Sequence, residues 1–384
     1  MKLTDLQTTE ERLELLEKTA TAFFDRAKKH DEESTFPFEN FADLRKINYP
    51  ALAVPKEYGG VGISLSELLK MQEIIAKYDG STALSIGWHM GITKHTGETH
   101  AWEEATYQSF VKDVLEKGAL LNNAATEPAT GSPTRGGRPE TVATKTENGW
   151  VINGRKSFTT LAPILDYISV SASIDGTEQV GSFLIRSELD GVSVDETWDS
   201  IAMKATGSHD LILENVHIES SDFLHYITPG NKEAQGWLLH IPACYLGIAK
   251  AAQKQAIAFA TSYSPSSING TISEIPTVKQ KIGEMELRIL ESSAFLYSVA
   301  KEWDESDVEA RNTMKAKLGA VKLSVVNKAL ETVDIAMRIV GARSLSAKSP
   351  LQRYYRDVRA GLHNPPMDDM TIMALAGESI SAHE

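Results

Sequence analysis

The stretch Asn123–Thr160 reads NAATEPATGSPTRGGRPETVATKTENGWVINGRKSFTT and joins two chemically different segments. Its first part, Thr126–Ser132, is rich in small and hydroxyl-bearing residues and is interrupted by Pro128 and Gly131. A loop of this kind lets backbone N–H groups and hydroxyls come close to a planar or phosphorylated ligand. The stretch therefore predicts a ligand-binding loop in front of a β segment.

The second part of the stretch predicts a β-hairpin. Trp150–Ile152 and Arg155–Thr160 favour strands, and Asn153-Gly154 between them is typical of a tight hairpin turn. Because side chains alternate along a strand, Phe158 and Thr160 are expected to point to one face. An aromatic ring and a hydroxyl would then lie side by side.

The composition narrows the class of protein. A chain of 384 residues is long enough for two or three packed units. Its net charge of −13 disfavours contact with a phosphate backbone, so no nucleic-acid partner is expected. The single cysteine, Cys244, rules out an internal disulfide and a cysteine metal cluster, and no histidine spacing indicates a metal. There is no signal-like segment and no apolar run of ~18 residues, which predicts a cytoplasmic protein without a membrane span.

Three parts of the chain differ in pattern. Residues 1–120 are predicted to be helical, beginning with a capping box at Thr8-x-x-Glu11. Residues 121–230 carry short β-rich runs between turn residues, as in a small β-barrel or sandwich. Residues 231–384 return to long helices, over 238–262, 277–303 and 308–340, with Gly341 as a C-cap. The predicted class is α+β, with an N-terminal helical domain, a middle β domain and a C-terminal four-helix bundle.

The segments TEPATGS and NGRKSFTT, in this domain order, resemble the flavin cradle of the acyl-CoA dehydrogenase family. VPKEYGGVG at residues 54–62 and the segment Trp198–Ser208 also resemble parts of that family, so the resemblance covers nearly the whole chain. It implies bound FAD, with FMN as the alternative, between the β domain and the bundle. It also implies a homotetramer, or at least a dimer.

The resemblance assigns individual residues to the flavin. In the family, the loop threonine and nearby N–H groups bond the pyrimidine end, an aromatic covers the ring, and a final threonine bonds N5. The matching positions here are Asn123, Ala125, Thr126, Gly131, Ser132, Phe158, Thr159 and Thr160. Gly341 and Arg343 stand where the family has its adenine-side Gly-Gly-Asn. Residues 262–267 replace the arginine segment that contacts the diphosphate, a loss for which Arg343 could partly compensate.

The carboxylate base of the family is missing at both of its known positions. It usually follows the Asp of an Arg-Asp pair by eight residues, and counting from Arg356-Asp357 reaches Pro365. In some members it precedes the Gly of a Leu-Gly pair by ten residues, and that position is Trp237. The nearest carboxylates in sequence that could replace it are Asp368 and Asp369.

Two histidines suggest a different reaction. His363-Asn364-Pro365 and Gly87-Trp88-His89 resemble segments in a branch of this superfamily that uses reduced flavin and oxygen, and that branch includes dibenzothiophene monooxygenase. Histidine can donate or accept a proton near neutral pH, so His363 and His89 are the predicted catalytic residues. The competing interpretation of His89 is a hydrogen-bonded histidine on a helix face.

Three functions therefore stay open. Family resemblance implies CH–CH oxidation of an acyl thioester such as an acyl-CoA, with electrons passed to an electron-transfer flavoprotein. The missing base favours a two-component monooxygenase that receives reduced flavin from a separate reductase. The third is a protein that binds flavin or acyl-CoA without catalysis. We predict a flavin-dependent oxidoreductase of a small-molecule substrate, and on the missing base we favour oxygen chemistry over dehydrogenation.

Overall fold

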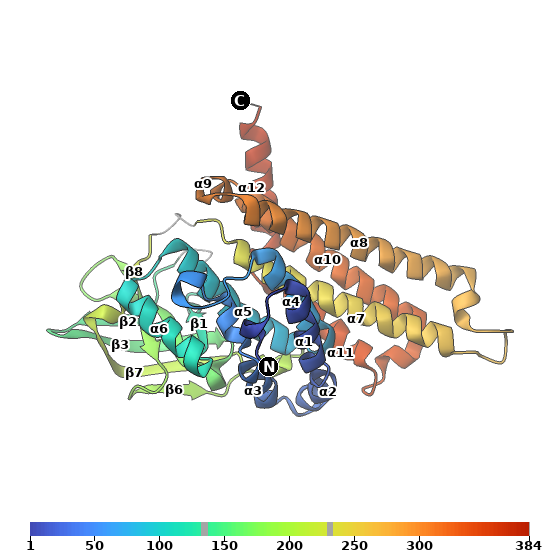
Figure 1. The fold of residues 1–384 in the computed structure, drawn as a ribbon, viewed down its shortest axis with the longest axis horizontal. Helices are drawn as coiled ribbons and strands as arrows, with labels where there is room; N and C mark the ends of the chain where they lie inside the picture. Colours follow the sequence, from blue (N-terminus) through green and yellow to red (C-terminus); the bar gives the residue numbers. More distant parts are fainter. Residues whose placement is uncertain (132–136, 229–232, 384) are drawn as a thin grey trace.

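The computed structural model describes residues 1–131, 137–228 and 233–383. A β-sheet lies at one end of the molecule, long helices extend from the other, and the N-terminal helices pack between them (Figure 1). This arrangement confirms the predicted fold class. The boundaries expected near residues 120 and 230 remain predictions; the strands occupy residues 121–226, with helices on either side.

The N-terminal helices form as their sequence predicts. They are α1 (Thr9–Ala20), α2 (Phe23–Glu33), α3 (Phe38–Lys46), α4 (Leu65–Tyr78), α5 (Gly80–Thr99) and α6 (Glu104–Lys117). The capping box is confirmed: the Glu11 N–H donates to Thr8 Oγ1 at 3.2 Å, and the Thr8 N–H donates to the Glu11 carboxylate at 3.1 Å. Short 3-10 turns separate α3 from α4.

The sheet has the strand order β6-β7-β3-β2-β4-β5-β8, with β1 parallel to β4. The strands are β1 (Leu121–Ala124), β2 (Val142–Lys145), β3 (Gly149–Thr159), β4 (Tyr167–Ile174), β5 (Val180–Arg186), β6 (Val192–Asp195), β7 (His209–Glu219) and β8 (Phe223–Tyr226).

The predicted hairpin turn at Asn153-Gly154 is wrong. Strand β3 runs straight through this dipeptide, and the turn lies earlier, where the Thr146 N–H donates to the Gly149 carbonyl at 2.9 Å. Pairing of β3 with both β2 and β7 keeps the strand extended across the dipeptide. The glycine serves close packing instead, since a Cβ at Gly154 would lie 2.4 Å from Thr141 Oγ1.

The C-terminal helices are α7 (His240–Ser262), α8 (Pro276–Glu305), α9 (Val308–Asn312), α10 (Lys315–Val340), α11 (Pro350–Asp357) and α12 (Asp368–Ser381). The single helix predicted over 308–340 is broken at Met314, which leaves the helical conformation and buries its side chain. Helices α7, α8 and α10 pack together, and α4 from the N-terminal part packs against α7 and α8. Gly341 caps α10 with φ +69°, as predicted.

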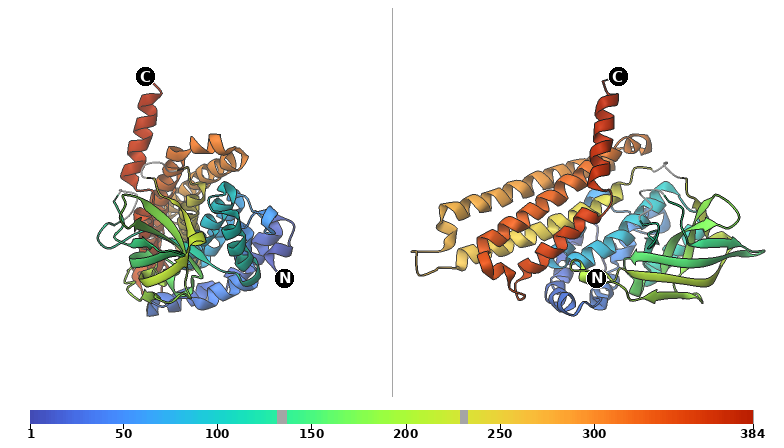
Figure 2. Two further views of the ribbon diagram at one scale, coloured as in Figure 1. Left: turned by 90° about the vertical axis from the view of Figure 1, so that its left-hand side faces the viewer. Right: turned by 180° about the vertical axis from the view of Figure 1, so that it is seen from behind.

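Helix α12 leaves the bundle and projects away from the rest of the molecule (Figures 1 and 2). Asp368 holds its first turn against α10 through Lys322 Nζ (3.0 Å) and Asn327 Nδ2 (3.2 Å). Among the helices of the described ranges, none is long and apolar enough to cross a bilayer.

Candidate functional site

The loop after β1 is joined to the end of β3. The Ser157 N–H donates to the Thr126 carbonyl at 2.8 Å, which places the hydroxyl-rich loop beside the strand end. Gly131 closes the loop onto Glu127 by paired backbone hydrogen bonds and has φ +67°, a conformation that glycine adopts without strain. The loop and the strand end, which the family resemblance assigns to one flavin, therefore lie together.

A buried ion pair holds the loop after β1 against β3. Lys156 Nζ lies 2.6 Å from Glu127 Oε1, and the N–H groups of Glu140 and Thr141 also donate to the Glu127 carboxylate. Burial opposes ionisation of Glu127, but these hydrogen bonds outweigh it and lower its pKa to about 2. The loop is thus held by a charged residue whose acceptor capacity is fully used.

A row of hydroxyls borders the end of β3. Thr160 Oγ1 lies 2.9 Å from Ser208 Oγ, which lies 2.8 Å from Thr206 Oγ1. Asn122 on β1 donates its amide to the Thr160 carbonyl at 2.9 Å. The hydroxyl and the backbone of Thr160 are therefore both held by hydrogen bonds at the end of β3.

Phe158 exposes its ring at the same end of β3. The residue has φ +57°, a backbone conformation that residues other than glycine rarely adopt, and 63% of it is exposed. The pairing of β3 with β7 shifts register between Lys156 and Thr159. The regular alternation of side chains, from which Phe158 and Thr160 were expected on one face, therefore does not hold at Phe158. Its ring meets Trp198 edge-on at 6.0 Å. An exposed aromatic on strained backbone is typical of a functional site.

The other residues assigned to the ring end of the flavin lie in the same region. Asn123 is exposed on β1, and Ala125 and Thr126 are half-buried in the following loop. Thr159 is fully buried, and its Oγ1 has no partner among the residues that the structure describes. Ser132 lies outside the described residues.

Gly341 and Arg343 lie elsewhere, at the end of α10 that points away from the sheet (Figure 1). The Arg343 guanidinium lies 4.4 Å from the Tyr263 ring centre and 5.9 Å from that of Phe259. Tyr263 belongs to the segment that replaces the diphosphate arginine. Arg343 thus stands beside the position whose charge is missing, but one chain alone does not bring it to the cradle.

His89 is fully buried under β1. The Leu121 N–H donates to its Nδ1 at 3.0 Å, and burial lowers its pKa to about 3. A neutral histidine in this position orients the start of the strand that leads into the loop. It has no exposed face for a substrate, so its catalytic role stays a prediction that the geometry does not favour.

The positions where a carboxylate base could lie differ in exposure and in hydrogen bonding. Trp237 is buried, and Pro365 follows Asn364, whose Oδ1 accepts from the Tyr245 hydroxyl at 2.6 Å. His363, next to Asn364, is exposed. The Asp368 carboxylate accepts hydrogen bonds from Lys322 and Asn327, while Asp369 is exposed on the next position of α12.

Some site residues were not assigned from the sequence. Trp198, Thr206 and Ser208 border Phe158 and Thr160, and Asn122 anchors the Thr160 carbonyl. For the first three, the sequence carries a signal, because the segment Trp198–Ser208 that contains them resembles part of the family. Asn122 gave no signal, since its role depends on β1 lying beside the end of β3.

Three family models match the chain in order. They are the N-terminal domain of acyl-CoA dehydrogenase over residues 9–108, the middle domain over 122–216 and the C-terminal domain over 239–364. The chain belongs to the acyl-CoA dehydrogenase family. It is a flavin-dependent oxidoreductase, as its relatives and structural neighbours are.

Individual relatives extend over nearly the whole chain. The putative acyl-CoA dehydrogenase YdbM of Bacillus subtilis is 48% identical over 371 residues, covering 96% of this chain and 97% of its own. Dibenzothiophene monooxygenase TdsC of Paenibacillus sp. A11-2, solved with FMN and indole, superposes with a TM-score of 0.85 at 23% identity, covering 97% of both chains. Butyryl-CoA dehydrogenase of Megasphaera elsdenii superposes with a TM-score of 0.85 at 20% identity, covering 98% of this chain and 99% of its own. The two structures show the same fold.

Proposed function

We propose that the flavin ring lies against the exposed edge formed by Phe158 and Thr160. The observation that carries this proposal is the exposed Phe158 ring beside the hydroxyl row of Thr160, Ser208 and Thr206. A planar ligand would cover the aromatic face and meet hydroxyl donors at its rim. When bound, flavin supplies two-electron redox chemistry, and the residues of the cradle hold and orient it.

We propose further that Gly341 and Arg343 contact the adenine or diphosphate end of a flavin held by a second copy of the chain. These residues lie at the far end of the bundle from the sheet, so one chain cannot use them together with Phe158. Arg343 beside Tyr263 offers a cation to a diphosphate. A homotetramer, or at least a dimer, follows from this proposal. The exposed apolar side chains of α12, Met370, Ile372, Met373 and Ile380, support assembly.

The geometry favours a reaction that uses reduced flavin and oxygen on a small organic substrate. Removing an α-proton from a thioester needs a carboxylate in a dry pocket. The two expected positions hold Pro365 and Trp237, and Asp368 is engaged by Lys322 and Asn327. In this proposal a separate reductase supplies the flavin, and the exposed His363 is the candidate proton donor or acceptor.

Dehydrogenation of an acyl thioester is the second candidate. It is favoured by the 48% identity to a putative acyl-CoA dehydrogenase across nearly the whole chain. This reaction would require Asp369 or another carboxylate to reach the substrate, and would pass electrons to an electron-transfer flavoprotein.

Anaerobic mixing separates the two reactions. We expect no bleaching of the bound flavin by butyryl-CoA, by isovaleryl-CoA or by long-chain acyl-CoAs, because neither family position of the base carries a carboxylate. Rapid bleaching by any of them would establish dehydrogenation. In parallel, protein supplied with chemically reduced FMN and labelled oxygen, with indole or dibenzothiophene as probes, should give labelled product. His363→Ala should lower that yield, whereas His225→Ala, an exposed histidine on β8, should not.

A further inference from the structure

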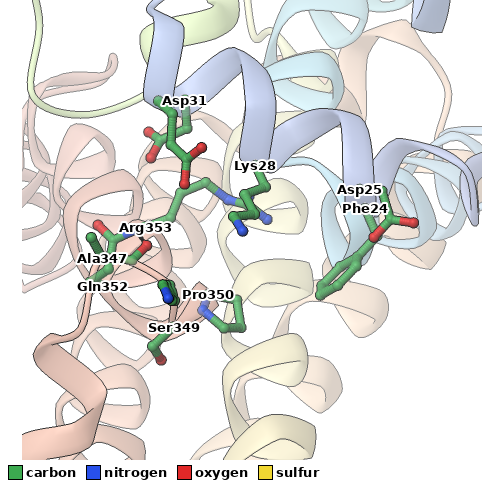
Figure 3. A pocket seen from close by; sticks show the side chains of 11 residues that line it. Phe24, Asp25, Lys28, Asp31, Ala347, Ser349, Pro350, Gln352 and Arg353 are labelled. Atoms are coloured by element: carbon green, nitrogen blue, oxygen red, sulfur yellow. Dashed lines mark hydrogen bonds between the residues drawn. The ribbon is translucent and has the colours of Figure 1, made fainter.

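A small pocket lies between α2 and the start of α11 (Figure 3). Its cavity volume is about 80 Å³, which exceeds the ~30 Å³ that one water occupies in the liquid. Side chains from α2 and from residues 347–353 line it. The pocket can therefore hold a small polyatomic ligand.

Arg353 is the decisive residue of this pocket. It is only 5% exposed, and its Nη2 is buried without a hydrogen-bond partner within the described part of the chain. A buried guanidinium N–H group without an acceptor is costly, because it has lost its hydrogen bond to water. Figure 3 shows the side chain reaching from α11 across the pocket towards α2.

The two buried carboxylates nearby are already engaged. Asp31 accepts from Arg356 Nη2 at 2.6 Å, and the Asp357 carboxylate accepts from the Met203 N–H at 2.7 Å. Neither makes a hydrogen bond to Arg353 in the described ranges. Among the residues that the structure describes, Arg353 Nη2 is thus buried beside a cavity and donates no hydrogen bond to either carboxylate.

Charged side chains of both signs line the rest of the pocket. Lys28 and Lys348 both line the pocket, and α11 begins there at Ser349-Pro350, with the positive end of its dipole. Three carboxylates also line it: Asp31, which is paired with Arg356, and Asp25 and Glu32, which are exposed to solvent as Lys28 and Lys348 are. In Figure 3, Asp25 lies on the side of the pocket away from Ser349 and Gln352.

We propose that this pocket binds a small oxyanion of the phosphate class. Arg353 would donate to two of its oxygens, and Lys28 and Lys348 would balance the remaining charge. A tetrahedral oxyanion suits a site lined by the planar Arg353 donor from α11, by Lys28 from α2 and by Lys348 from the segment before α11. The ligand is either free phosphate or the phosphate group of a nucleotide cofactor.

The test measures thermal unfolding and isothermal titration with inorganic phosphate, against chloride at equal ionic strength. Phosphate should raise the midpoint of the wild-type protein, because a ligand that binds only the folded state stabilises it. Arg353→Met should weaken phosphate binding by about tenfold or more, and Lys28→Met should weaken it by a smaller factor. Arg359→Met removes an arginine that is paired with Asp334, so phosphate binding should stay at the wild-type level.

Titration of flavin-free and FAD-loaded protein separates the two sources. Loss of phosphate binding on FAD loading assigns the site to the cofactor phosphate, and unchanged binding assigns it to free oxyanion. Equal stabilisation by phosphate and chloride, or equal phosphate binding by wild type and Arg353→Met, would overturn the proposal. If Arg353→Met does not fold, Lys28→Met together with Lys348→Met at the rim decides the question in the same way.

Discussion

Lys156 Nζ and Glu127 Oε1 lie 2.6 Å apart, with both side chains buried, under the loop that leads to the proposed flavin site. The pair joins β3 to the loop after β1, so it fixes the position of this loop relative to the sheet. Since each charge is the main compensation for the other, removing one leaves an uncompensated charge in the interior.

Glu127→Gln should therefore lower the free energy of unfolding by about 3 to 5 kcal/mol. Denaturant unfolding checks this value. Combined replacement, Glu127→Leu with Lys156→Met, should recover most of the loss, because no buried charge remains. A double variant as unstable as Glu127→Gln would show that the carboxylate acts through Glu140 and Thr141 instead. The pKa of Glu127 is lowered to about 2, below its unfolded value of ~4.3, so its contribution is present above pH ~4.3 and is lost as the pH falls towards 2.

Phe158→Gly should stabilise the protein and weaken its hold on flavin. The left-handed backbone of Phe158 (φ +57°) costs a residue with a side chain about 1 to 3 kcal/mol, which glycine avoids. After the entropic cost of glycine, the expected gain in the free energy of unfolding is about 1 kcal/mol. The ratio of flavin to protein after gel filtration should fall, because the ring proposed to cover the flavin is gone.

Phe158→Ala is the matched variant for this prediction. It removes the ring but keeps the strained backbone, so flavin retention should fall without a gain in stability. Thr160→Ala should also reduce retention. Wild-type flavin content in all three variants would contradict the cradle assignment.

His240 makes the stability of the fold depend on pH. The side chain is fully buried, its ring lies parallel to Trp237 at 5.9 Å, and burial lowers its pKa to about 3. Because the unfolded residue titrates near 6.5, the unfolded state binds an extra proton below that pH, and stability falls as the pH drops from 6.5 towards 3. Each such histidine contributes about 1.4 kcal/mol per pH unit in this range.

His240→Phe should flatten this part of the pH profile and keep the aromatic contact with Trp237. Denaturant unfolding at pH 7 and pH 5 measures the difference. His363→Phe, at an exposed position, serves as the control and should leave the slope unchanged. An unchanged slope in His240→Phe would show that His240 is not titrated in this range.

Helix α12 should take part in assembly. Ile372 and Met373 are exposed on a helix that contacts the body mainly through its first turn. Charges placed on an apolar interface oppose association, so Ile372→Glu with Met373→Glu should reduce the particle mass measured by light scattering. Ser379→Glu, on the exposed end of the same helix, should leave the mass unchanged. An unaltered mass in the double variant would exclude α12 from the interface.

The sequence by itself determined the class of fold and predicted where the flavin would bind. Capping at Thr8, the glycine cap at Gly341 and the TEPATGS loop are local signals, which depend on neighbours a few residues away. The same local reasoning failed at Asn153-Gly154, where cross-strand pairing on both sides of β3 keeps the chain extended through a dipeptide that favours a turn.

The tertiary structure alone decided which side chains are available for chemistry. It placed His89 beneath Leu121, engaged Asp368 with Lys322, and set Ser208 beside Thr160. These relationships join residues 32 to 48 positions apart. Burial and hydrogen bonding between distant segments depend on how the sheet and the helices pack, and the pattern of one segment carries no information about them.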